Sequence, residues 1–238
     1  MAWNPRLFGE QTLDTGQKTL TKTFHLESLA RMKILVIGAT GLTGNHLVRK
    51  LLAQGHEVSA FVRDASKMTA HDPKLNVVLG EARDLATLEK AVKGQEAVFS
   101  AFGPRSLKKD DLQEVFMKNL VTAMTKAGVQ RLVNLSAMGA GDSRAGAPLI
   151  MRAVILPLFL GKMFEDKNKG EVFLFSSNLD YVNVRPGRLT NSPACGSVKA
   201  SLTYKGLKPV MSREDLADFM VAQLSSSQWV RQSPLIGY

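Results

Sequence analysis

Residues 34–44 read Ile-Leu-Val-Ile-Gly-Ala-Thr-Gly-Leu-Thr-Gly, an apolar run that passes directly into three glycines at every third position. The four apolar residues Ile34–Ile37 predict a strand that is buried on both faces. A helix is predicted next, from about Thr43 to Gln54, and Gly55 suits its C-terminal end. One face of that helix carries the apolar residues Leu47, Val48, Leu51 and Leu52. The stretch therefore predicts a buried strand, a tight turn and an amphipathic helix in succession.

The three glycines stand where a dinucleotide-binding turn requires them. Gly38 permits a tight turn after the strand, and Gly41 removes the Cβ that would keep a pyrophosphate away from the backbone. Gly44 allows close packing at the start of the helix. The free N–H groups of the turn and the positive end of the helix dipole then face an anion. Strand, glycine turn and helix together predict a dinucleotide site.

The rest of the chain alternates short apolar runs with longer helical segments, the pattern of a parallel sheet with crossover helices. The predicted strands are Ile34–Ile37, Glu57–Val62, Asn76–Leu79, Ala97–Ala101, Arg131–Leu135 and Tyr181–Val184. The further predicted helices are Leu85–Val92, Leu112–Ala127, about Lys162–Ser176 and Glu214–Leu224. Ser212 is the expected N-cap of the last one, with Asp215 completing a variant of the capping box. These elements predict a single doubly wound, Rossmann-like α/β domain over residues 32–238. Residues 186–210 are rich in Gly, Pro and Ser and are interpreted as an irregular flap on the substrate side.

The end of the second predicted strand bears on the choice of cofactor. An NAD site places an acidic residue there to bind the ribose 2′-hydroxyl, whereas this strand ends in Val62-Arg63-Asp64, with Lys67 close behind. Arg63 offers a planar fork and Lys67 a second positive charge for a 2′-phosphate. We therefore expect NADP(H) in preference to NAD. Two alternatives stay open: Asp64 serves the ribose of NAD, or Arg63 is only a solvated charge at a strand end.

Four motifs in order carry a resemblance to a known family: 38–44, 62–64, 80–84 and 184–187, the last reading Val-Arg-Pro-Gly. Together they resemble the atypical short-chain dehydrogenase/reductases. Within these, the chain is similar to the NAD(P)H-binding subgroup that contains flavin reductase/biliverdin-IXβ reductase and NmrA-like proteins. The likeness covers about residues 32–230. The segment 209–217 also resembles the family's closing segment, in which a Ser-capped helix follows the last strand.

The resemblance implies a role for each of several residues. Thr40, Leu42 and Thr43 would line the pyrophosphate turn, and Asp84 with Leu85 would border the adenine. Ser136, at the end of the fifth strand, would lie beside the nicotinamide and near a substrate oxygen. The remaining implied cofactor contacts are Ala101, Phe102 and Gly103 beneath the nicotinamide-side ribose, and Pro186 to Leu189 over the carboxamide.

The chain differs from typical members of the family at the position of their proton-donating tyrosine. Typical members carry a Tyr four residues before a Lys that holds the ribose. The resemblance places that Lys at Lys167, but the residue four before it is Met163, and a thioether is no acid. The alternative for Lys167 is a solvated charge at the start of a polar helix. We expect Ser136 and Lys167 to be the residues nearest the chemistry.

Two functions are compatible with the missing tyrosine. The first is an NADPH-dependent reductase that passes hydride to a flavin, a biliverdin-like tetrapyrrole, a quinone or a similar conjugated acceptor, which collects its proton from water. The second is a non-catalytic NADP(H)-binding regulator or assembly factor of the NmrA-like type. Sugar-nucleotide epimerisation is disfavoured because it depends on the missing Tyr.

The amino-acid composition limits the classes of molecule that the protein is expected to bind. The net charge is +10, but the Lys and Arg residues are dispersed, with no run of five. A basic balance also attracts an anionic cofactor and substrate, so we expect a small-molecule acceptor and no nucleic acid. No apolar run reaches the roughly 20 residues of a membrane span. The four histidines lack metal-ligand spacing, so no metal is expected. We expect a monomer or a small homo-oligomer.

Residues 1–31 show no sustained period and carry too many acidic residues for a typical transit peptide. They are interpreted as a loosely ordered N-terminal extension or an over-long start, with Met32 as an alternative first residue. A single cysteine, Cys195, excludes an internal disulfide and favours a reducing compartment, the cytoplasm. Cys195 is not expected to be a nucleophile, because no His is placed to activate it.

Overall fold

Strand β1 (Lys33–Ile37) is buried on both faces from Ile34 onward, as its unbroken apolar run predicts. It lies between β2 (Glu57–Val62) and β4 (Ala97–Ser100) and runs parallel to both. The structure is a computed structural model, and it describes residues 31–103, 111–144, 146 and 161–238. The interpretation of the N-terminal extension falls on residues outside that description and stays a prediction.

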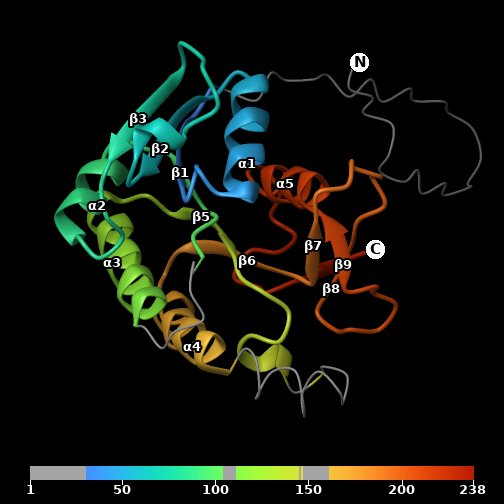
Figure 1. Cartoon of the computed structure of the whole chain (residues 1–238). Helices are drawn as coiled ribbons and strands as arrows, with labels where there is room; N and C mark the ends of the chain where they lie inside the picture. The colour runs from blue at the N-terminus through green and yellow to red at the C-terminus, as the bar shows by residue number, and fades with distance from the viewer. Residues whose placement is uncertain (1–30, 104–110, 145, 147–160) are drawn as a thin grey trace, which may run out of the picture. The chain divides into compact units, whose positions relative to one another are not determined.

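An eight-stranded sheet organises residues 32–238 (Figure 1). Its order is β3-β2-β1-β4-β5-β6-β10-β8, and all neighbours are parallel except β10 and β8. The strands not yet given are β3 (Leu75–Leu79), β5 (Arg131–Leu135), β6 (Asp180–Pro186), β8 (Lys199–Ser201) and β10 (Leu235–Gly237). The strand order reverses next to β1, so the carboxyl ends of β1 and its neighbours border a crevice where ligands bind in such sheets. The predicted doubly wound fold is confirmed.

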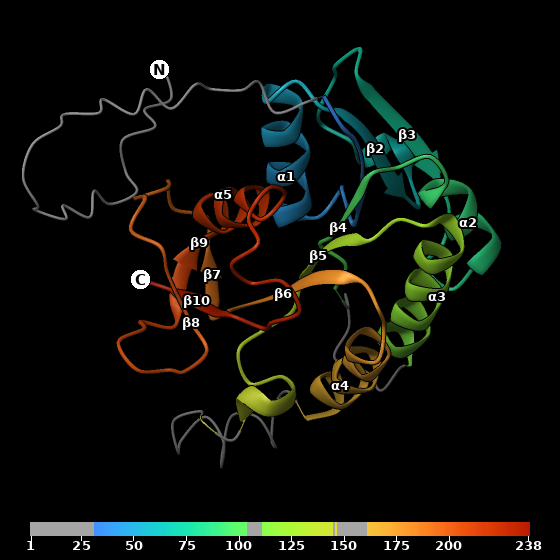
Figure 2. The same ribbon diagram turned by 180° about the vertical axis from the view of Figure 1, so that it is seen from behind.

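Helices cover the two faces of the sheet in two groups (Figures 1 and 2). On one face lie α1 (Leu42–Ala53) and α5 (Arg213–Ala222), which pack against each other over one apolar core. On the other lie α2 (Leu85–Val92), α3 (Leu112–Ala127) and α4 (Gly161–Phe175), over a second core. Both cores contain side chains of β1, because a central parallel strand alternates between the two faces.

The segment after β6 is less irregular than predicted. It contains β7 (Arg188–Thr190) and β9 (Val210–Ser212), which pair with each other in parallel, and β8, which extends the main sheet. The pairing needs Gly187, because a Cβ there would lie 2.2 Å from the carbonyl oxygen of Pro209. Strands of three residues show no period in the sequence, so β7 to β10 were not predictable from pattern alone.

The N-terminus of α5 is the meeting point of three distant segments. Ser212 caps the helix as predicted, its hydroxyl accepting from the N–H of Asp215 at 3.0 Å. The Asp215 carboxylate accepts from the hydroxyl of Tyr238 at 2.6 Å and from the N–H groups of Cys195 and Gly196 at 3.0 and 2.9 Å. Although burial opposes ionisation, these hydrogen bonds hold the pKa of Asp215 below its ordinary value. Asp215 thus ties the flap and the C-terminus to α5.

Replacing Asp215 by Asn is expected to lower the free energy of unfolding by about 2 kcal/mol at neutral pH, because charge-assisted hydrogen bonds are lost. The lowered pKa of Asp215 contributes stability above the unfolded-state pKa of about 4, and this contribution is lost as the pH falls through the lower folded-state value. Urea unfolding between pH 7 and pH 3 measures both effects. Asp218→Asn, on the exposed side of α5, is the matched control and is expected to change little. Equal pH dependence in D215N and the unchanged protein would contradict the assignment.

Candidate functional site

The glycine turn between β1 and α1 is fitted to its surroundings by close backbone contacts. Gly38 has a φ of +77°, and a Cβ on it would lie 2.7 Å from the carbonyl oxygen of Ala101 at the end of β4. A Cβ on Gly44 would lie 2.1 Å from the carbonyl oxygen of Gly38. A Cβ on Gly41 would meet only that same oxygen, at 3.1 Å, and would otherwise face open space. The turn therefore needs glycine at 38 and 44 for its own folding, and leaves the space at Gly41 open to a ligand.

A cleft of about 560 Å³ lies over this turn at the carboxyl ends of β1, β2 and β4. Its lining includes eight of the predicted cofactor contacts: Gly38, Thr40, Gly41, Leu42, Thr43, Ala101, Phe102 and Gly103. Arg63 and Leu189 line it as well, so the flap closes one side. The structure thus brings the glycine turn, the end of β2 and the flap to one cavity, the arrangement expected for a dinucleotide.

A smaller hollow of about 320 Å³ adjoins the cleft at the end of β2, lined by Thr40, Arg63, Asp64 and Lys67. Asp64 caps a 3-10 turn (Ala65–Lys67), accepting from the N–H of Ser66 at 3.0 Å and lying 3.2 Å from the Lys67 amine. Hydrogen bonds from Ser66 and Lys67 hold the pKa of Asp64 below its ordinary value. Arg63 lines both cavities and forms no ion pair with any described residue. Asp64 is therefore engaged locally, whereas the Arg63 guanidinium is available to an anion.

Six further residues line the cleft without having been predicted as contacts: Ile37, Phe61, Val62, Gly80, Ala82 and Arg213. Gly80 makes room for the ring of Phe61, because a Cβ there would lie 2.5 Å from the ring. Arg213, in the first turn of α5, donates to the Asn191 side chain at 2.6 Å and brings a second guanidinium to the cleft. No sequence signal placed Arg213 here, since its approach depends on how α5 packs against α1.

Several other residues predicted to contact the cofactor are not among the described residues that line the cleft. Asp84 and Leu85 do not line it, and Asp84 instead caps α2 by accepting from the N–H of Ala86 at 2.9 Å. Gly44 is buried beneath the turn. Ser136, Lys167 and Pro186 are also absent from its lining. Their contacts with a cofactor stay predictions.

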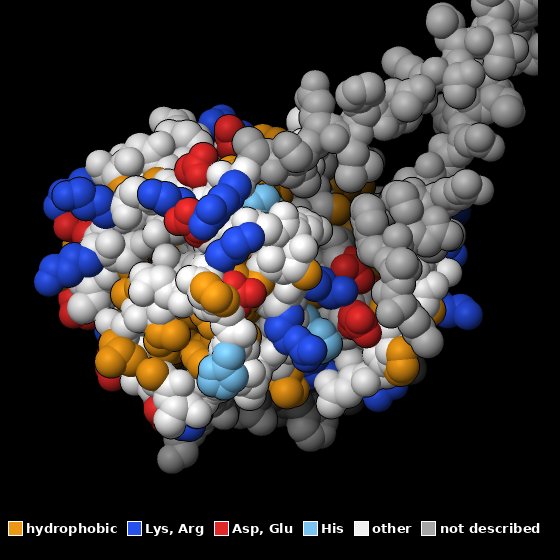
Figure 3. Space-filling view, turned by 90° about the horizontal axis from the view of Figure 1, so that it is seen from above, with side chains coloured by type: hydrophobic (Ala, Val, Ile, Leu, Met, Phe, Trp, Pro, Cys, Tyr) orange, Lys and Arg blue, Asp and Glu red, His pale blue; other side chains and the backbone are white. Residues whose placement is uncertain are grey.

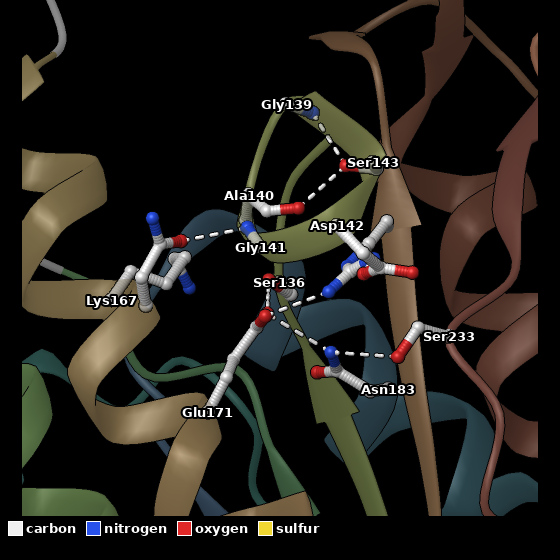
Figure 4. Close-up of polar contacts among 12 residues, drawn as sticks. Ser136, Gly139, Ala140, Gly141, Asp142, Ser143, Lys167, Glu171, Asn183 and Ser233 are labelled. Atoms are coloured by element: carbon white, nitrogen blue, oxygen red, sulfur yellow. Dashed lines mark hydrogen bonds and ion pairs between the residues drawn. The ribbon is translucent and has the colours of Figure 1, made fainter. Parts of the chain in front are cut away.

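A buried polar network surrounds Ser136 at the end of β5 (Figure 4). Its centre is Glu171 of α4, whose carboxylate accepts from the Ser136 hydroxyl at 2.5 Å and from the Asn183 amide at 2.9 Å. The other carboxylate oxygen lies 2.7 Å from Nη2 of Arg185, whose Nη1 lies 2.5 Å from Asp142. Burial lowers the pKa of Arg185, but the neighbouring Glu171 and Asp142 outweigh it and raise that pKa. The paired carboxylate of Glu171 thus fixes the hydroxyl of Ser136.

Lys167 lies one helical turn before Glu171 and is buried, 8% exposed, so the alternative of a solvated surface charge is wrong. Its amine donates to the carbonyl oxygen of Leu135 at 3.4 Å. Burial lowers the pKa of Lys167, against the opposing effect of Glu171 and Asp166. Asp166 accepts from two N–H groups of the first turn of α3, at 2.9 and 3.0 Å, and so joins α4 to α3. That junction holds Lys167 beneath the end of β5.

Comparison with known proteins supports this geometry. A family model described as NAD(P)H-binding matches residues 38–227, from the glycine turn to beyond α5. The chain belongs to this NAD(P)H-binding family. The predicted resemblance to the atypical short-chain dehydrogenase/reductases is thereby confirmed.

Relatives of the chain carry names of different kinds. An uncharacterised chloroplastic protein of Arabidopsis thaliana is 34% identical over 81% of this chain and 71% of its own length. Sterol demethylase protein B of Methylococcus capsulatus is 39% identical over 46% of this chain and 35% of its own length. Photosystem II assembly factor Ycf39 of Synechocystis is 30% identical over 63% of this chain and 43% of its own length. The chain spans less than half the length of the last two.

Solved structures share the fold at low identity. A short-chain dehydrogenase/reductase of Veillonella parvula in complex with NADP has a TM-score of 0.74 and 19% identity, covering 87% of this chain and 94% of that one. The anaerobillin reductase ChuY of Escherichia coli O157:H7 has a TM-score of 0.73 and 21% identity, covering 86% and 96%. At such identities the likeness establishes the fold alone.

The surface seen in Figure 3 carries Lys and Arg side chains interspersed with Asp and Glu. That face shows no continuous basic patch, and the expectation of no nucleic-acid partner stays a prediction. None of the described helices is long and apolar enough to cross a bilayer. Within the described ranges, no three His, Cys, Asp or Glu residues are grouped as metal ligands.

Proposed function

We propose that this protein is an NADPH-dependent reductase that acts on a flavin, a biliverdin-like tetrapyrrole, a quinone or a similar conjugated acceptor. The observation that carries the proposal is the pair of adjoining cavities at the glycine turn, which share Thr40 and Arg63; the larger reaches Leu189 of the flap and the smaller reaches Lys67. Gly41 leaves room for a pyrophosphate, and the two cations suit a 2′-phosphate. NAD would leave Arg63 without an anionic partner. These residues fit NADP(H).

The residues around the end of β5 define what the protein itself supplies. When bound, NADPH supplies a hydride from its nicotinamide ring. In the structure the Ser136 hydroxyl donates a hydrogen bond to the Glu171 carboxylate. The Ser136 oxygen is therefore oriented to accept a hydrogen bond from the cofactor or the acceptor. We infer that Ser136 and Lys167 position the reacting groups and that the acceptor takes its proton from water. Such positioning serves a conjugated acceptor better than a simple ketone, which needs a proton donor at its oxygen.

A second candidate is a non-catalytic NADP(H)-binding regulator or assembly factor. It is favoured by the hydrogen bond that the Ser136 hydroxyl donates to Glu171, because a hydroxyl engaged in this way does not replace the missing tyrosine as a proton donor. One relative of the chain is named as a photosystem II assembly factor, which is compatible with such a role. Turnover decides between the two candidates.

The first test follows NADPH oxidation at 340 nm with FMN, riboflavin, biliverdin and simple quinones, alongside NADPH titration by fluorescence. Turnover with at least one acceptor is expected. Ser136→Ala is expected to lower kcat about tenfold while NADPH still binds, because one orienting hydrogen bond is lost. Ser176→Ala is the matched control, since that exposed hydroxyl bonds only to the carbonyl of Phe173. NADPH binding without turnover across the panel would favour the regulator, and absence of NADPH binding would refute both candidates.

The remaining proposals concern location and assembly. A cytoplasmic location rests on the single cysteine and on the reducing compartment that it suits. Two of the relatives are chloroplastic proteins of Arabidopsis thaliana, so the family is not confined to the cytoplasm. A monomer or a small homo-oligomer is proposed, with a small-molecule acceptor as the partner.

A further inference from the structure

A third, separate cavity of about 880 Å³ lies beside β6 and the start of β10, on the side of the turn Gly141–Arg144. None of its lining residues lines either cavity of the dinucleotide site. Its volume falls within the roughly 300–1,000 Å³ of small-molecule sites. The cavity therefore has the size of a ligand site that the dinucleotide does not use.

Arg185 lines this cavity with an incomplete set of hydrogen bonds. Its side chain is 1% exposed, and its two Nη atoms bind Glu171 and Asp142. Its Nε is buried and has no hydrogen-bond partner among the described residues. The hydroxyl of Tyr204, which also lines the cavity, is likewise buried and finds no partner in the part of the chain that the structure describes. Buried groups of this kind are rare in folded proteins, and an acceptor atom of a ligand would satisfy them.

Arg231, at the rim of the cavity, has a strained backbone. Its φ is +58°, and it is the non-glycine residue with a positive φ within the described ranges. The strain is held by hydrogen bonds from its N–H to the carbonyl of Tyr181 at 2.7 Å and from its guanidinium to the carbonyl of Asn178 at 2.8 Å. Strained residues of this kind cluster at ligand sites. Two contacts, one with the carbonyl of Asn178 and one with the Asp180 carboxylate at 3.8 Å, hold the Arg231 guanidinium at the cavity.

The charges and rings of the cavity define the chemistry of a ligand. Arg185, Arg231 and Lys205 line it. Arg185 is paired to Glu171 and Asp142, and Arg231 lies 3.8 Å from the Asp180 carboxylate, whereas Lys205 forms no ion pair with a described residue. Phe175 and Tyr181 line the same cavity with ring centroids 5.7 Å apart. The Lys205 amine and the unsatisfied donors of Arg185 and Tyr204 favour an anionic acceptor group, and adjoining aromatic rings favour a planar apolar body. Asp142 is 84% exposed on its side chain, so it is free to move aside for a ligand carboxylate.

We propose that this cavity is a binding site for a planar aromatic carboxylate, held by Arg185, Arg231 and Lys205 and stacked beside Phe175 and Tyr181. The site is separate from the dinucleotide cleft and does not depend on the proposed reductase activity. A ligand there leaves the glycine turn and Arg63 untouched.

Equilibrium dialysis with 1-naphthoate tests the proposal, using the full chain with and without saturating NADPH. One naphthoate per chain is expected to bind with the same Kd in both conditions. The neutral analogue 1-naphthamide is expected to bind at least about tenfold more weakly, because it lacks the charge. Arg231→Gln and Lys205→Gln are each expected to raise the Kd for naphthoate about five- to tenfold, and Tyr204→Phe about threefold. Arg49→Gln, an exposed arginine of α1, is the matched control and is expected to leave the Kd unchanged.

Competition between naphthoate and NADPH distinguishes this cavity from the dinucleotide cleft. Displacement of naphthoate by NADPH would place the binding in the cleft and overturn the proposal. So would undetectable naphthoate binding, equal binding of naphthamide, or an unchanged Kd in both R231Q and K205Q. Lys205 is exposed and lies outside the hydrogen-bond network of β6, so K205Q keeps the test valid if R231Q fails to fold.

Discussion

Arg63→Glu is expected to weaken NADPH binding about 100-fold or more while it changes the affinity for NADH less than about threefold. The guanidinium lines both the main cleft and the adjoining hollow, and forms no ion pair with a described residue. The variant removes a charge-assisted contact to the 2′-phosphate and adds a carboxylate beside Asp64, so that two negative charges face the phosphate. Fluorescence titration of both nucleotides at a fixed, low salt concentration measures the two affinities.

Two controls make this result specific. Arg49→Glu has the same change of net charge on an exposed position of α1, and it is expected to leave both affinities unchanged. Lys67→Gln is expected to weaken NADPH binding by a smaller factor than R63E does, because the Lys67 amine already forms an ion pair with Asp64 at 3.2 Å. Equal losses of NADPH and NADH in R63E would refute the assignment of Arg63 to the 2′-phosphate. Other residues of the cleft would then set the preference between NADPH and NADH.

Gly44→Ala is expected to lower the free energy of unfolding by about 3 kcal/mol or more and to abolish measurable NADPH binding. Its new Cβ would lie 2.1 Å from the carbonyl oxygen of Gly38 and 2.8 Å from the carbonyl carbon, both backbone atoms that have no rotamer with which to move aside. The start of α1 must therefore shift away from the turn, and its N–H groups no longer face the pyrophosphate. Thermal and urea unfolding, together with NADPH titration, measure the two losses.

Gly41→Ala is the comparison that separates folding from binding. Its Cβ would meet one atom, the carbonyl oxygen of Gly38, at 3.1 Å, so the free energy of unfolding is expected to change by less than about 1 kcal/mol. NADPH affinity is still expected to fall about tenfold or more, because the added methyl group occupies the approach of the pyrophosphate. Stability losses of the same size in G41A and G44A would contradict this division of roles.

The sequence by itself determined the local units of the fold. The run Ile34–Ile37 and the glycines after it predict β1, the turn and α1, because a doubly buried strand and an amphipathic helix each have a periodicity visible over a few residues. The same holds for the Ser212 cap of α5. The turn residues and Arg63 come directly after β1 and β2 in the chain. Because these strands are parallel, the residues that follow them lie at the same, carboxyl edge of the sheet. Most of the cleft was therefore predictable.

Tertiary structure alone decided the contacts between segments that are distant in the sequence. Ser136 meets Glu171 across 35 residues, and the position of Lys167 beneath β5 depends on how α4 packs against α3. Arg213 reaches the cleft through the packing of α5 on α1, and the cavity at Arg185 and Arg231 is lined by residues of both β6 and β10, which pair in parallel. A residue's own neighbours fix its helix or strand, whereas its partners in a buried network are fixed by the packing of whole elements, which leaves no local pattern in the sequence.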